Sequence, residues 1–93
     1  MTDEELDRLI NEMDETLENL PQPEGKLPKQ EARHRRVLAS KTRMLKRMKL
    51  AREDGNKNRE FYYGYCYDVL NRWGEKHPLL ARFLMSNVMW EDV

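Results

Sequence analysis

Residues 29–53 read KQEARHRRVLASKTRMLKRMKLARE, a strongly basic stretch that contains neither proline nor glycine. Its apolar residues recur at helical spacing, and at about 100° per residue they gather within an arc of roughly 140°. Lys41 falls inside this arc, where a lysine can bury its aliphatic stem and keep its ammonium group in water. The apolar residues are Val37, Leu38, Met44, Leu45, Met48 and Ala51. We therefore predict one amphipathic helix over residues 29–54, with this apolar stripe in the core.

The opposite side of the predicted helix carries six cations, where we expect a partner or a nucleic acid to bind. They are Arg35, Arg36, Arg43, Lys46, Arg47 and Lys49. No acid lies within the run from Arg35 to Lys49, and like charges on successive turns repel one another. Three counterparts can balance this face: solvent, the acidic N-terminal segment, or a negative partner such as a phosphate backbone or an acidic protein surface.

Charge is strongly segregated along the 93 residues, although the net charge is zero. Residues 1–25 hold nine acids and one base, residues 26–59 hold thirteen bases and three acids, and residues 60–93 hold three bases and five acids. Such segregation indicates an intramolecular match between acidic and basic parts, an oppositely charged partner, or both. The length suits a single domain with a small core.

Residues 1–20 are predicted to form an acidic amphipathic helix. Thr2 and Glu5 have the spacing of a capping box, which favours a helix start at this point. A narrow apolar stripe suits either ordinary packing of a surface helix or a two-helix seam. The stripe comprises Leu6, Leu9, Ile10, Met13, Leu17 and Leu20. If this helix screens the basic one, we expect Glu12, Glu15 and Glu18 to take part. Residues 21–28 contain three prolines and a glycine, which predict a linker.

Residues 57–73, KNREFYYGYCYDVLNRW, contain an aromatic pattern with two interpretations. Aromatic residues at positions 61, 63, 65 and 67 alternate as in a strand. The chain offers no second strand for pairing, however, and a lone strand is not stable. We therefore predict a helix, capped by Asn56 after a turn at residues 54–56. Gly64 costs this helix about 1 kcal/mol unless its missing side chain permits close approach of another helix.

The same aromatic residues raise a functional alternative. Tyr62, Tyr63 and Trp73, with Arg59 and Arg72 nearby in the sequence, have the composition of a stacking platform for single-stranded bases. Aromatic residues at helical spacing are more often part of the core, and that is the interpretation we prefer.

Residues 78–90 are predicted to form a last helix, which begins at Pro78 and is apolar on nearly every side. Such a helix is either central in the fold or covered by another molecule. Because so short a chain has few helices to surround it, we predict that Phe83 and Trp90 anchor a partner.

The sequence carries no catalytic or metal-binding motif. His34 and His77 have no Cys or Asp at ligand spacing, and the one cysteine, Cys66, has the character of a small buried side chain. Phosphate-binding loops and nucleophile-elbow patterns are absent. We expect no enzyme activity, no cofactor and no metal. The acidic N-terminus, the single cysteine and the lack of an apolar run of about 20 residues predict a cytoplasmic protein with no membrane partner.

Together these features predict an all-α protein, a small bundle of three to four helices with a long basic central helix. We expect a non-enzymatic adaptor or inhibitor, of a kind that suits bacterial or phage regulators, that docks on a larger nucleic-acid-handling protein or nucleoprotein complex. The basic helix would steer the encounter, and the apolar helix at residues 78–90 would hold it. One alternative is a direct nucleic-acid-binding protein that uses the Arg35–Lys49 face. Another is a structural subunit that associates with copies of itself.

Overall fold

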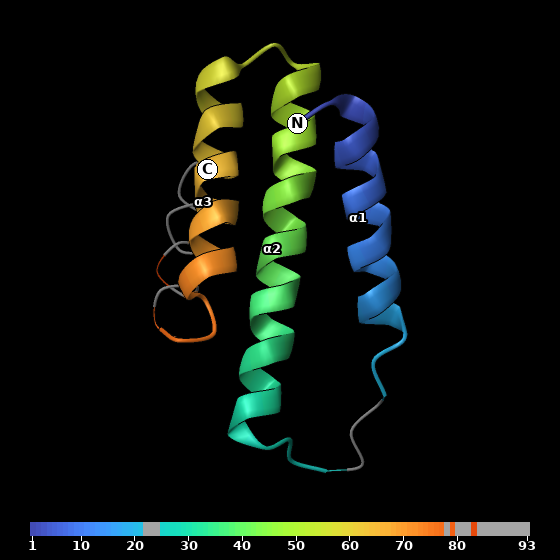
Figure 1. The fold of residues 1–93 in the computed structure, drawn as a ribbon, viewed down its shortest axis with the longest axis vertical. Coiled ribbons are helices and arrows are strands. Elements are labelled where there is room, and N and C mark those ends of the chain that lie inside the picture. Colours follow the sequence, from blue (N-terminus) through green and yellow to red (C-terminus); the bar gives the residue numbers. More distant parts are fainter. Residues whose placement is uncertain (22–24, 78, 80–82, 84–93) are drawn as a thin grey trace.

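A computed structural model of the chain describes residues 1–21, 25–77, 79 and 83. Its elements are three α-helices in the order α1 (Asp3–Glu18), α2 (Lys29–Glu53) and α3 (Lys57–Trp73). α2 lies between α1 and α3 and runs antiparallel to both (Figure 1). No strand occurs in the part of the chain that is described. The protein is therefore an all-helical bundle, as the sequence predicts.

The helix boundaries follow from local capping. The Thr2 hydroxyl accepts a hydrogen bond from the Glu5 backbone N–H at 3.2 Å, and the Asn56 side-chain oxygen accepts one from the Arg59 N–H at 3.1 Å. Each bond satisfies a backbone donor that a helix start leaves without a partner. Between α2 and α3 the chain turns at Gly55, whose φ of 71° favours glycine. Both predicted caps and the predicted turn are confirmed.

The core is built on the apolar stripe of α2. All six of its predicted residues are buried: Val37, Leu38, Met44, Leu45, Met48 and Ala51. α1 contributes Leu6 and Ile10 to the core, and α3 contributes Tyr63, Cys66 and Leu70. Lys41 lies at the edge of the stripe, half-buried, and its ammonium group donates a hydrogen bond to the Asn71 side-chain oxygen at 3.1 Å. The stripe of α1 packs against this core, so it forms a seam with α2.

α3 is a helix along its whole length, which excludes the strand interpretation. The exposed fraction is 78% for Phe61, 3% for Tyr63 and 59% for Tyr65, because these residues lie on different sides of the helix. A Cβ atom on Gly64 would lie 3.3 Å from the Met48 sulfur. This glycine therefore allows α2 and α3 to approach closely, the condition under which its low helix propensity is tolerated.

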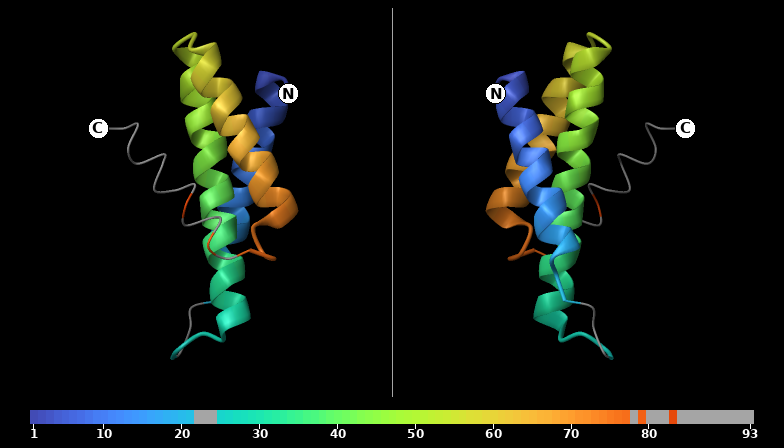
Figure 2. Two further views of the ribbon diagram at one scale, coloured as in Figure 1. Left: turned by 90° about the vertical axis from the view of Figure 1, so that its left-hand side faces the viewer. Right: turned by 90° about the vertical axis from the view of Figure 1, so that its right-hand side faces the viewer.

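Most of the predicted helix at residues 78–90 lies outside the described residues. Leu79 and Phe83 are described, and both side chains are exposed. Figure 2 shows that the N-terminal part of α2 extends beyond the ends of α1 and α3. None of the helices described is long and apolar enough to cross a membrane.

Candidate docking surface

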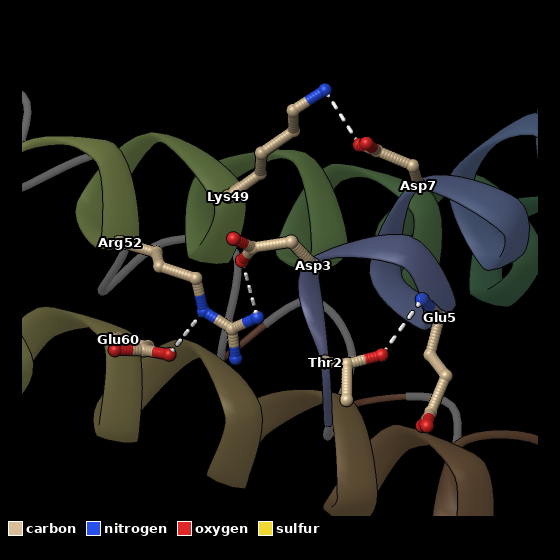
Figure 3. Close-up of polar contacts among 7 residues, drawn as sticks. All are labelled: Thr2, Asp3, Glu5, Asp7, Lys49, Arg52 and Glu60. Carbon is tan, nitrogen blue, oxygen red and sulfur yellow. Dashed lines mark hydrogen bonds and ion pairs between the residues drawn. The ribbon is translucent and has the colours of Figure 1, made fainter.

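Ion pairs join the acidic α1 to the basic α2. Asp7 contacts the Lys49 ammonium at 2.6 Å, and Asp14 contacts the Lys46 ammonium at 3.0 Å. Nearer the N-terminus, Asp3 accepts a hydrogen bond from Arg52 at 2.8 Å. Figure 3 shows the Asp3–Arg52 and Asp7–Lys49 contacts beside the Thr2 cap. The opposite charges along the sequence are thus matched within the fold.

Arg52 connects all three helices. Besides Asp3 of α1, its guanidinium donates to Glu60 of α3 at 2.6 Å (Figure 3). Hydrogen bonds to Asp3 and then to Glu60 raise the Arg52 pKa, and the hydrogen bond and charge of Asp7 raise the Lys49 pKa. The contacts with these acids thus favour the charged forms of both cations.

The acids that meet α2 are not those expected from the sequence. Glu12, Glu15 and Glu18 are exposed, and none of them forms an ion pair with another described residue. The aspartates lie at the side of the α1 apolar stripe, where helix packing brings them beside α2. The sequence shows which side of α1 is acidic, but not how α1 is rotated about its axis against α2.

The six predicted cations of α2 differ in their surroundings. Lys46 and Lys49 pair with α1, whereas Arg35 contacts Glu31 at 3.1 Å and donates to the Pro21 carbonyl at 2.7 Å. The run itself contains no acid, and its acidic partners come from the start of α2 and from α1. Glu31 lies just before the run, one helical turn from Arg35, which is the spacing of a helical ion pair. Arg47 is half-buried.

Arg36 and Arg43 remain available on the surface. Both are exposed, and neither makes an ion pair within residues 1–21 and 25–77. They are separated by two helical turns, or roughly 10.5 Å along the axis. Ala39 and Leu50 are exposed on the same side of α2, and Leu50 has an exposed fraction of 59%. We define the basic outer face as Arg36, Ala39, Arg43 and Leu50.

A second polar cluster joins the start of α2 to the end of α3. The His34 ring nitrogen Nδ1 contacts a Glu75 carboxylate oxygen, and Arg33 donates to the Glu75 carbonyl at 3.2 Å. The hydrogen bond from His34 holds the pKa of the Glu75 carboxyl below its ordinary value of 4.5. Both side chains are largely exposed. This cluster fixes the turn after α3 against α2.

Tyr63 belongs to the core, as the preferred interpretation of the aromatic residues predicts, and cannot take part in the alternative, a base-stacking platform. Tyr63 is buried in the core and makes an edge contact with the Tyr62 ring at a centroid distance of 5.6 Å. A ring in this position offers no face to a base. Trp73 is half exposed, but the Lys76 ammonium lies over its ring at 5.7 Å. Phe61 and Tyr65 are also exposed aromatic side chains of α3.

Phe61 and Tyr65 border an open groove of about 750 Å³ that the sequence interpretation missed. Met1, Met48 and Gly64 also line the groove. A signal for this groove is nevertheless present in the sequence. Phe61 and Gly64 are three residues apart, and a charged residue lies one helical turn away on either side, Lys57 before Phe61 and Asp68 after Gly64.

Of the two predicted apolar anchors, Phe83 is 62% exposed and Trp90 lies outside the described residues. Within the described part of the chain, no group of three or more His, Cys, Asp or Glu side chains could hold a metal ion. Cys66 is fully buried. The fold and its surfaces thus define a small charge-paired helical bundle. Comparisons with protein-family models, curated proteins and solved structures gave no match.

Proposed function

We propose that this chain is a small non-enzymatic docking protein, an adaptor or inhibitor. Its basic outer face binds an acidic surface on a larger nucleic-acid-handling protein or nucleoprotein complex. The observation that carries the proposal is the position of Arg36 and Arg43, which are exposed and make no ion pair with the described residues. By contrast, Arg35, Lys46, Lys49 and Arg52 of the same helix form ion pairs with acids of the chain.

The composition of the basic outer face favours a protein surface over a phosphate backbone. Binding to a phosphate backbone draws its strength from the number of cations that contact phosphates. Here Arg35, Lys46 and Lys49 already have acidic partners within the fold. Leu50 and Ala39 add apolar area beside the two arginines, and protein interfaces commonly combine arginine with an apolar centre.

A second contact is proposed for residues 78–90. The exposed Phe83 side chain supplies apolar area suited to slow dissociation, while the arginines accelerate the encounter with an acidic partner. Trp90 belongs to this part of the proposal on the basis of the sequence.

The test begins with affinity capture of the partner from the native cell, with and without nuclease treatment. The purified partner is then bound to the wild-type chain and to a variant with Arg36→Ala and Arg43→Ala. We expect association to slow by about tenfold at low salt, with a smaller effect at high salt. The matched control is Arg59→Ala with Arg72→Ala, which removes two exposed arginines from α3.

An unchanged association rate for the α2 variant at low salt contradicts the proposal, as does an equal loss for the α3 control. Capture that disappears after nuclease treatment supports direct nucleic-acid binding instead. In that case the purified chain should bind duplex or single-stranded nucleic acid with an affinity that falls steeply with salt.

A further inference from the structure

The groove beside Phe61 belongs to a regular stripe on α3. Lys57, Phe61, Gly64 and Asp68 follow one another at steps of four, three and four residues, and all four line the groove. At about 100° per residue they fall within an arc of roughly 60°, as do the contact positions of a coiled coil. Phe61 and Asp68 are both exposed. For Phe61 this exposure is unfavourable, because its ring is fully apolar.

The stripe is complementary to itself. In an antiparallel pair of α3 helices related by a two-fold axis near residues 62 and 63, Lys57 faces Asp68 of the second copy. Phe61 then faces Gly64 of the second copy, and each contact occurs twice because the interface is symmetric. A parallel in-register pair would instead place each lysine against its own copy, so charge selects the antiparallel arrangement.

The groove also has a suitable floor for the incoming ring. Gly64 has no side chain, and the buried Met48 lies beneath it, with its sulfur 3.3 Å from the position of a Gly64 Cβ. Met1 and Tyr65 border the same space. A phenylalanine ring that enters over the glycine can contact the thioether sulfur of Met48, a favourable contact for an aromatic ring.

We propose that a second copy of this chain occupies the groove and forms an antiparallel α3–α3 dimer. The inference is independent of the proposed function, since the basic outer face belongs to α2. The rings of Phe61 and Tyr65 from both copies, four in all, bury on the order of 600–1,000 Å² in total. This area is small for a protein interface. The dimer is therefore weak and concentration-dependent.

The test exchanges the two charges of the stripe. The variants are Lys57→Glu alone, Asp68→Lys alone, and both together, compared by sedimentation equilibrium of the full chain from roughly 1 μM to 1 mM. Each single change opposes like charges twice in the dimer, and we expect dimerisation to weaken by about tenfold. The double variant restores opposite charges and should dimerise as the wild type does.

Mixing the two single variants gives the most specific result. A heterodimer of Lys57→Glu with Asp68→Lys has opposite charges at both contacts, so the mixture should associate about as tightly as the wild type, although each variant alone dimerises more weakly. Phe61→Ala should weaken the dimer at least tenfold. Arg59→Glu is the matched control, because it makes the same charge change on another side of α3 and should leave the dimer unaffected.

Loss of folding does not explain such a pattern. Lys57 is the first residue of α3, where an acidic side chain favours the helix dipole, so Lys57→Glu should melt no earlier than the wild type. The proposal is wrong if the wild-type chain stays monomeric over the whole concentration range. This is also the result expected if a different protein occupies the groove. It is equally wrong if the single changes have no effect or if the mixture fails to associate.

Discussion

Gly74 shows how closely the end of α3 packs against α2. It is buried, and a Cβ atom at this position would lie 2.5 Å from the Leu70 carbonyl oxygen and 2.9 Å from a methyl group of Val37. Gly74→Ala must therefore displace backbone as well as a core side chain. We expect the free energy of unfolding to fall by about 1–3 kcal/mol, measured by urea denaturation.

Gly25→Ala provides the control for that measurement. Apart from its chain neighbours, no atom of the described residues lies within 4 Å of the added Cβ at Gly25, so its effect should stay within about 0.5 kcal/mol. Equal stabilities of the Gly74 variant and the wild type would mean that the end of α3 can move away from Val37 at no cost.

Glu75 gives the stability of the protein a specific pH dependence. Its pKa in the folded chain is lowered, chiefly by the hydrogen bond with His34, so the folded state favours the ionised carboxylate. Its contribution is therefore present above the ordinary carboxyl pKa of 4.5 and is lost as pH falls through the lower, folded value. At neutral pH, Glu75→Gln should lower the free energy of unfolding by less than about 1 kcal/mol, because the His34–Glu75 pair is exposed.

The measurement is thermal unfolding of both proteins over a range from about pH 7 to about pH 2.5. The difference between their melting temperatures should become smaller as the pH falls. The control is Glu12→Gln, because Glu12 forms no ion pair with another described residue, and its melting temperature should stay close to that of the wild type at every pH. A gap between wild type and Glu75→Gln that widens on acidification would rule out this linkage.

At the level of single residues, the sequence predicts burial better than it predicts polar partners. The hydrophobic spacing correctly places Met44 and Leu45 in the core and Lys41 at its edge. The partner of Lys41, Asn71, lies on another helix. Such a contact depends on how two helices are rotated and shifted against each other, and neither quantity is contained in the periodicity of one helix.

At the level of helices, the ion pairs between α1 and α2 can be tested by a matched comparison. Asp7→Asn with Asp14→Asn removes two acids that contact lysines of α2. Glu12→Gln with Glu15→Gln removes two acids from the same helix that make no such contact. We expect the aspartate variant to unfold at a slightly lower urea concentration at low salt, because exposed ion pairs contribute little individually to stability.

At high salt the two variants should have similar stabilities, since screening weakens interactions between exposed charges. Chemical denaturation by urea, which adds no ions, allows this comparison at low and high sodium chloride. Equal stability of the two variants at low salt would show that the pairing of α1 with α2 contributes nothing beyond apolar packing.

The helices themselves are well predicted, and the surfaces between them are not. Asn56 and Gly55 correctly mark the start of α3, and the lack of a pairing partner correctly excludes a strand. The acidic contacts expected from Glu12, Glu15 and Glu18 are made instead by aspartates at the side of the apolar stripe, Asp3, Asp7 and Asp14. The exposure of Phe61 is evident only in the structure, because periodicity does not show which side of α3 packs against α2.

For the whole molecule, protection from hydrogen exchange should vary along α2. The buried residues of this helix begin at Val37, and its earlier turns extend beyond α1 and α3 (Figures 1 and 2). Amides in residues 33–36 should therefore exchange through local opening of the helix. Their protection factors, the ratios of intrinsic to observed exchange rate, should be at least tenfold lower than those of Met44 and Met48. Amide exchange followed by nuclear magnetic resonance measures this difference, and uniform protection along α2 would exclude local opening.

The position of α2 between its two neighbours in sequence also has a consequence for refolding kinetics. Each helix–helix interface joins consecutive elements, through the connections at residues 19–28 and 54–56. Short loops cost little closure entropy, and proteins dominated by contacts near in sequence fold in about microseconds to milliseconds. The α2–α3 hairpin has the shorter connection and can assemble first. The acidic α1 then reaches a lysine-lined helix that is already in place, so long-range attraction speeds the last step of folding.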